Sequence, residues 1–127
     1  MIPLPTWMRN ALFATSVMNV LVAGVFLVPA AEPLRMLMGL PAAGHPLYLL
    51  TVGLFVLLFG CLYLSAAMTG HADRPFIAAA AAGKLGFVGL LVSFWAMGSL
   101  PLRAPVLGGA DLVFAALFLA WLFGARP

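Results

Sequence analysis

Charged side chains are scarce in this 127-residue sequence: Asp, Glu, Lys and Arg make up 7% of it, against about 25% in an ordinary soluble domain. Hydrophobic residues make up 65%, and the mean hydropathy is +1.19. Six basic and three acidic side chains are too few to cover the surface of a soluble domain of this length. The composition therefore predicts an integral membrane protein.

Cysteine and histidine are nearly missing as well. Cys61 is the only cysteine, so the chain has no internal disulfide, and one thiol makes no metal cluster. His45 and His71 are expected on opposite sides of the membrane, where they cannot share a metal ion. The six basic residues are scattered singly and form no patch for nucleic acid. We therefore expect no metal, no cofactor and no nucleic-acid partner, and membrane lipids as partners.

Four apolar segments are each long enough for a spanning helix, which needs about 20 residues. They cover residues 10–28, 47–68, 76–97 and 105–123. Backbone groups in lipid must pair internally, and the alternation of a barrel strand is absent, so helices are expected. The sequence predicts an all-α fold in which residues 1–127 form a single domain, a four-transmembrane-helix bundle with both termini on one side. The first segment is alternatively a cleaved signal peptide, although its apolar run is longer than a signal core.

Basic residues near the segment ends indicate the orientation. The side that holds both termini, called side A, carries Arg9, Arg74 and Arg126. The opposite side, called side B, carries Arg35 and Arg103 with Glu32 beside them. Because cytoplasmic loops are enriched in Lys and Arg, side A is predicted to be cytoplasmic by a narrow margin.

Side B also gathers a group of polar side chains, called the side B rim. It consists of Glu32, Arg35, His45, Tyr48 and Arg103. Residues 33–39 within it are suited to a short apolar turn on the membrane surface, with Arg35 reaching the lipid headgroups. Two interpretations are open: the rim binds a headgroup or an acidic ligand, or its members are solvated loop ends.

The third segment carries a stripe of small residues on one face, given about 100° of rotation per residue. The stripe consists of Ala79, Ala82, Gly86, Gly89, Ser93 and Ala96. Small residues let another helix backbone approach closely, so this face is predicted to make the tightest helix contact. Lys84 lies about 180° from the stripe, outside that contact.

The charged ammonium of Lys84 has a high free-energy cost in hydrocarbon. Lys84 therefore extends to water, is held by a partner, or has a function in the protein. It lies roughly 12 Å from side A, which allows it to extend toward that side with Tyr63 as a neighbour. Alternatively it pairs with Asp111, roughly 9 Å from side B, with Asn19 as an added donor. Asp111 can instead be neutral or pair with Arg103. Asn19, Tyr63, Lys84 and Asp111 are the candidate ligand-binding or buried polar residues, and no catalytic residue is assigned.

One short motif in each segment resembles small bacterial four-helix membrane proteins, the DoxX-like group and related uncharacterised families. The motifs are NVLVAGVFLVP from Asn19, LFGCLY from Leu58, GKLGF from Gly83 and ADLVFA from Ala110. The resemblance implies four helices and a bacterial inner membrane, in which the predicted orientation places the termini in the cytoplasm. It supplies no active site.

Three functions are consistent with these features. We favour an accessory or binding module for a lipophilic ligand or a membrane partner, because the third segment has a small-residue stripe, loops are nearly absent and catalytic motifs are lacking. The second is a membrane-embedded enzyme on a lipid or isoprenoid, with Asp111 or Glu32 as acid or base and Lys84 stabilising negative charge. A polar pocket around Asn19, Lys84 and Asp111 would favour it. The third is a small oligomeric transporter with Lys84 or Asp111 at a protomer interface. A homo-oligomer or a larger membrane complex is compatible with the membrane setting.

Overall fold

The computed structural model describes residues 1–41 and 44–124, and these are all-α apart from one short strand pair. Arg126, which the sequence analysis assigned to side A, lies outside the described residues. Three helices are long and apolar enough to cross a membrane. They are α1 (Thr6–Leu27), α3 (Pro46–Thr69) and α4 (Arg74–Ala96). They correspond to the first three predicted segments, with ends that differ by one to four residues.

The fourth predicted segment is not one continuous helix. It divides at Gly108 into α5 (Arg103–Leu107) and α6 (Gly109–Phe123), and α6 has 15 residues. Consecutive glycines are poor helix formers, and Pro105 removes a backbone donor one turn earlier, so the helix is weakest at this point. Gly108 also lies close to α4, because a Cβ placed there would be 3.0 Å from Leu91 Cδ1.

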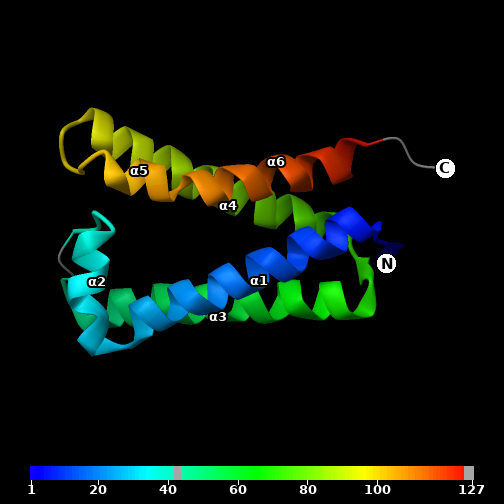
Figure 1. Cartoon of the computed structure of the whole chain (residues 1–127), viewed down its shortest axis with the longest axis horizontal. Helices are drawn as coiled ribbons and strands as arrows, with labels where there is room; N and C mark the ends of the chain where they lie inside the picture. Colours follow the sequence, from blue (N-terminus) through cyan, green and yellow to red (C-terminus); the bar gives the residue numbers. More distant parts are fainter. Residues whose placement is uncertain (42–43, 125–127) are drawn as a thin grey trace.

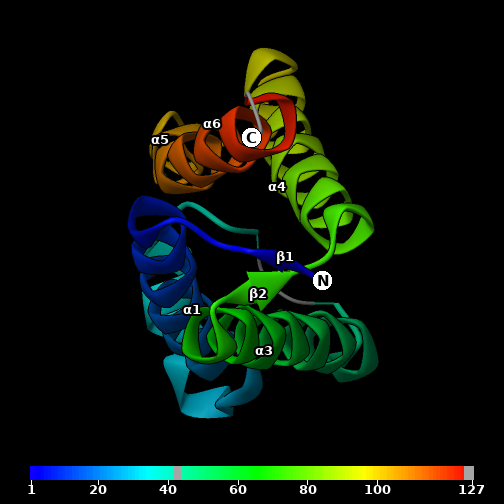
Figure 2. The ribbon, with the colours of Figure 1, turned by 90° about the vertical axis from the view of Figure 1, so that its right-hand side faces the viewer.

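The helices form two antiparallel pairs, α1 with α3 and α4 with α6 (Figure 1). Seen along the helices in Figure 2, the α4–α6 pair covers the α1–α3 pair. Two short elements follow α1: a 3-10 helix at Pro29–Ala31 and α2 (Glu32–Leu37). The two pairs approach most closely near the amino terminus and diverge toward α2 (Figure 1). The end near the amino terminus, where the two helix pairs are closest, is called the narrow end.

The apolar core occupies the narrow end. Its members come from both helix pairs and include Met8, Leu12, Ile77, Phe118 and Leu122, each buried. The two-residue strands β1 (Ile2–Pro3) and β2 (His71–Ala72) pair next to it. The chain's amino-terminal strand and the end of α6 thus lie at the same end of the molecule (Figure 1).

Two arginines close that end by donating to helix-terminal carbonyls. Arg9 Nε donates to Ala67 O at 3.0 Å, which ties α1 to the end of α3. Arg74 Nη1 donates to Leu122 O at 2.7 Å, which ties the start of α4 to the end of α6. The last carbonyls of a helix lack partners within the helix, so these bonds satisfy groups that would otherwise need water.

The small-residue stripe of α4 does not make the contact predicted for it. Ala79, Ala82, Gly86, Gly89, Ser93 and Ala96 are all exposed, and open space surrounds the positions where Gly86 and Gly89 would carry a Cβ. The close approach lies instead between α1 and α3. A Cβ at Gly53 would be 2.9 Å from Leu27, and one at Gly60 would be 3.1 Å from Asn19 Cβ.

Candidate functional site

Lys84 lies midway along α4, on the face that turns into the molecule. Ile77, Ala80, Ala81 and Leu91 are the other buried residues of this helix, and their spacing places them on the same side. Only 7% of the Lys84 side chain is exposed. The orientation of α4 is thus the reverse of the predicted one, with the lysine face inside and the small-residue face outside.

Asp111 is the partner of Lys84. Lys84 Nζ donates to Asp111 Oδ1 at 2.8 Å, and the Asp111 side chain is 18% exposed. Asp111 lies in the first turn of α6, where the partial positive charge of the helix terminus favours a carboxylate. The break at Gly108 creates this helix terminus inside the molecule. The structure therefore has the Lys84–Asp111 pair and not an extension of Lys84 to the headgroups, while the pairing of Asp111 with Arg103 is absent.

Two aromatic rings enclose the ammonium. Lys84 Nζ lies 5.4 Å from the centroid of Tyr63 and 5.4 Å from that of Phe114. A cation at this distance over a ring is attracted by its π-electrons. Tyr63 is thus a neighbour of Lys84, as predicted. Its ring contacts an ammonium that is bonded to Asp111, however, and not one that extends toward water.

Asn19 lies close to the pair without bonding to it. Its Nδ2 donates to Val56 O at 3.1 Å, which links α1 to α3. The predicted role of Asn19 as a donor to Asp111 is therefore wrong. Asn19 is 9% exposed, and its amide donates to a carbonyl of the neighbouring helix. A polar group in an apolar interior is costly unless it is hydrogen-bonded, so this bond lowers the cost of burying Asn19.

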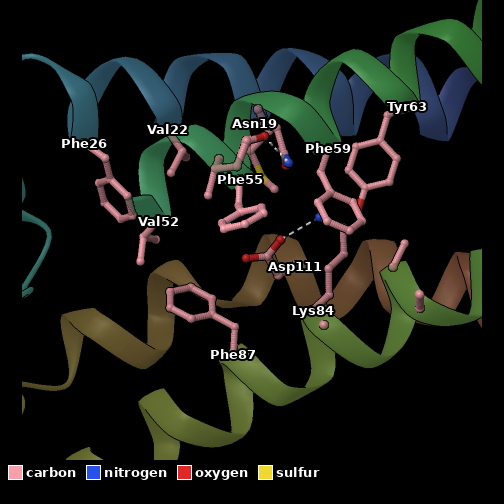
Figure 3. Close-up of a pocket in the computed structure, with 15 residues that line it drawn as sticks. Asn19, Val22, Phe26, Val52, Phe55, Phe59, Tyr63, Lys84, Phe87 and Asp111 are labelled. Atoms are coloured by element: carbon pink, nitrogen blue, oxygen red, sulfur yellow. Dashed lines mark hydrogen bonds and ion pairs between the residues drawn. The ribbon is translucent and has the colours of Figure 1, made fainter. Parts of the chain in front are cut away.

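A cavity of about 350 Å³ adjoins the Lys84–Asp111 pair between the two helix pairs. Asn19, Tyr63, Lys84 and Asp111 all line it (Figure 3). The other walls are mainly apolar side chains of α1, α3 and α4: Met18, Val22, Phe26, Val52, Phe55, Val56, Phe59 and Phe87. The volume falls within the range of small-molecule sites, about 300–1,000 Å³, and an apolar lining with few polar groups is typical of them.

The phenylalanines of α3 that line this cavity were not predicted, whereas Phe87 lies on the face of α4 that carries Lys84, as helical spacing predicts. Phe55 and Phe59 are one turn apart on α3, and Phe87 lies one turn after Lys84 on α4. The spacing of four residues places Phe55 and Phe59 on the same face as Tyr63, and the spacing of three places Phe87 on the same face as Lys84. The helical spacing of Phe55 and Phe59 with Tyr63 was thus an available signal for an aromatic face on this helix. Which of the many apolar side chains face inward depends on the packing of all the helices.

The side B rim does not form one site. Arg35 is 6% exposed and turns inward, where its Nη1 donates to Val25 O at 2.7 Å and to Val28 O at 3.3 Å. The prediction that Arg35 reaches the headgroups is therefore wrong. Its charge instead lies at the end of α1, where the carbonyls carry partial negative charge, and Val28 O also accepts from Ala31 N at 3.0 Å.

The remaining rim residues are exposed and serve separate ends of helices. Arg103 Nη2 donates to Met36 O at 3.3 Å, which links α5 to α2. His45 Nδ1 accepts from Leu47 N and so caps α3, with the ring of Tyr48 at 6.5 Å. Glu32 lies in the first turn of α2. These contacts agree with the interpretation of the rim as helix and loop ends. In the described part of the chain, no three His, Cys, Asp or Glu residues are grouped to hold a metal ion.

No family model matches the sequence, and no curated protein and no solved structure matches it either. The resemblance to DoxX-like proteins therefore stays a prediction.

Proposed function

We propose that this chain is an integral membrane protein that binds a lipophilic molecule in the cavity beside Lys84 and Asp111. In this proposal four apolar units cross the bilayer: α1, α3, α4, and α5 together with α6. The length and hydropathy of the first three support the membrane setting. Both termini lie on one side, and the basic residues there favour the cytoplasmic side of a bacterial inner membrane.

The observation that carries the proposal is the chemical division of the cavity walls. One wall holds the Lys84–Asp111 pair, and apart from Asn19 the others are mainly aliphatic and aromatic. A cavity with apolar walls and one charged position matches a molecule with a hydrocarbon part and a single polar group. Such molecules are abundant in a bilayer.

The second candidate function is a membrane-embedded enzyme, and one observation favours it. Asn19, Lys84 and Asp111 line the same cavity, as an acid–base site on a lipid would require. The amide of Asn19 is bound to Val56 O, however, and Lys84 and Asp111 bond to each other. Since these groups already serve structural bonds, binding accounts for the cavity with fewer assumptions than catalysis.

The transporter hypothesis needs Lys84 or Asp111 at the contact between protomers. Both side chains face the cavity of a single chain (Figure 3). Homo-oligomerisation therefore gives no added role to the pair, and we do not adopt this function.

The binding proposal is tested on the full chain in phosphatidylcholine nanodiscs with a photoactivatable diazirine hydrocarbon that has no polar group. After illumination, mass spectrometry locates the label. Phe26 and Ala80 line the cavity and are buried from the surrounding lipid, so label on them reports occupation of the cavity. We expect both to be labelled in the wild-type protein.

Two matched variants of α1 control this experiment. Val22→Trp places an indole in the cavity and should abolish labelling of Phe26 and Ala80. Val17→Trp makes the same substitution at a position that is 59% exposed and should leave the labelling unchanged. Equal labelling of both variants, or none in the wild type, would contradict the proposal.

A further inference from the structure

The two oxygens of the Asp111 carboxylate have different surroundings. Oδ1 accepts the bond from Lys84 Nζ at 2.8 Å. Within residues 1–41 and 44–124, no donor is found for Oδ2. Figure 3 shows one oxygen joined to Lys84 and the other directed away from it, on the side where Val52 and Phe87 lie. The carboxylate therefore presents an unused acceptor to the cavity.

Lys84 is less available than Asp111 to a molecule in the cavity. Its side chain is 7% exposed, against 18% for Asp111, and the rings of Tyr63 and Phe114 lie beside its ammonium. Of the two charged groups, a ligand in the cavity thus meets the carboxylate more readily than the ammonium. An ionised carboxylate only accepts hydrogen bonds, so the matching group of the ligand must be a donor.

The charge of the site selects among donors. Lys84 and Asp111 together are neutral, and the cavity contains no other Lys, Arg, Asp or Glu among its lining residues. A protonated amine beside the pair would leave a net positive charge in an apolar interior, which is unfavourable. A carboxylic acid in its ionised form has no donor and would repel Asp111. A hydroxyl group donates without adding charge.

From these contacts we infer that the cavity takes an uncharged lipid alcohol, whose hydroxyl donates to Asp111 Oδ2. This inference rests on the proposed binding function. The hydrocarbon chain of the ligand lies among Phe26, Phe55 and Phe87, which line the cavity. The Lys84–Asp111 pair then has a purpose beyond joining α4 to α6, because the lysine fixes the carboxylate with one oxygen directed into the cavity.

The experiment compares the head groups of diazirine probes that share one chain: an alcohol, a carboxylic acid and a primary amine. A probe without a head group is included, and the alcohol is tested with both a straight and an isoprenoid chain. The full protein in phosphatidylcholine nanodiscs at pH 7 is labelled, and label on Phe26 and Ala80 is measured. We expect one or both alcohols to label these residues about tenfold more than the acid and the amine, since the added hydrogen bond involves a charged group.

The variant that tests the role of Asp111 replaces both members of the pair, Lys84→Met with Asp111→Leu. This keeps an apolar interior and leaves no unpaired charge, whereas Asp111→Asn alone leaves Lys84 without its partner. The preference for the alcohol should disappear in the double variant, while the probe without a head group still labels the cavity.

Each other outcome has a distinct meaning. Strongest labelling by the amine or the acid, equal labelling by all head groups, or an alcohol preference that survives in the double variant would overturn the inference and leave the binding function standing. Absence of cavity labelling by every probe, including the one without a head group, would overturn the binding function itself.

Discussion

Lys84 on α4 and Asp111 on α6 are joined by a 2.8 Å hydrogen bond across two helices that residues 97–108, including α5, connect. Both charges lie in a mainly apolar interior, at the boundary between the packed core and the cavity. The pair thus combines a structural contact with a polar position on the wall of the proposed ligand site.

The first prediction concerns the coupling of these two residues. Lys84→Met leaves a carboxylate without its cation and should lower the free energy of unfolding by about 2–3 kcal/mol, toward the lower end for a buried pair because Asp111 is partly exposed. Asp111→Leu should cost a similar amount. The double variant should recover most of the loss, since no unpaired charge remains. Unfolding in mixed detergent micelles measures all four proteins.

The coupling in this double-mutant cycle decides the outcome. Effects of the single variants that add to within about 0.5 kcal/mol would show that Lys84 and Asp111 do not interact in the folded protein.

The position of this pair was accessible to sequence reasoning for a geometric reason. Each residue of a helix adds a fixed rise, so depths counted from the two ends of neighbouring segments brought Lys84 and Asp111 near one another. Asn19 was predicted as an added donor to this pair, but depth alone does not give the direction of a side chain around the helix axis. In the structure that direction takes Asn19 to the Val56 carbonyl.

The prediction that the small-residue stripe makes the tightest helix contact was wrong for a related reason. Small side chains permit a close helix contact, but they do not supply the second helix. In α4 the face opposite the stripe carries Lys84, and the pairing of Lys84 with Asp111 requires that face to turn inward. The close helix contact is instead made between α3 and α1. Gly53 and Gly60 of α3, separated by seven residues, face α1 there.

The second prediction uses these glycines. Gly53→Ala introduces a methyl group 2.9 Å from Leu27 and 3.0 Å from Phe26 Cβ, which forces α1 and α3 apart. Overpacking of this kind costs about 1–3 kcal/mol. Gly24→Ala on α1 is the matched control, because nothing lies within 4 Å of the new methyl group. It should be neutral or stabilising by up to about 1 kcal/mol through helix propensity. Thermal unfolding in detergent compares them, and equal effects would contradict the α1–α3 contact.

The third prediction contrasts two arginines that both donate to carbonyl groups. Arg35 is buried and bonds to Val25 O and Val28 O, so Arg35→Gln should destabilise the fold by about 1.5–3 kcal/mol. Arg103 is exposed and makes one longer bond to Met36 O, so Arg103→Gln should change stability by less than about 0.5 kcal/mol. Chemical unfolding in detergent provides the comparison. A larger effect at Arg103 would mean that Arg35 does not hold the end of α1.

The last prediction concerns Thr15 on α1, whose Oγ1 is fully buried with no hydrogen-bond partner among the described residues. Valine has nearly the same shape and lacks the hydroxyl, so Thr15→Val should stabilise the protein by about 1 kcal/mol by removing an unsatisfied group. Ser16 is the neighbouring control, because its Oγ donates to Phe13 O at 2.7 Å. Ser16→Ala should be neutral or slightly destabilising.

Thermal unfolding of the two variants in the same detergent measures this difference in sign. A loss of stability on Thr15→Val would show that the Thr15 hydroxyl has a partner in the folded protein, such as a bound water molecule. Buried water commonly makes about three hydrogen bonds to polar groups that lack protein partners. Since Asn19 lies one turn after Thr15 on the same face of α1, such a water would extend the polar surface of the cavity toward the core. A gain of stability would instead define the Thr15 hydroxyl as an uncompensated cost of the fold.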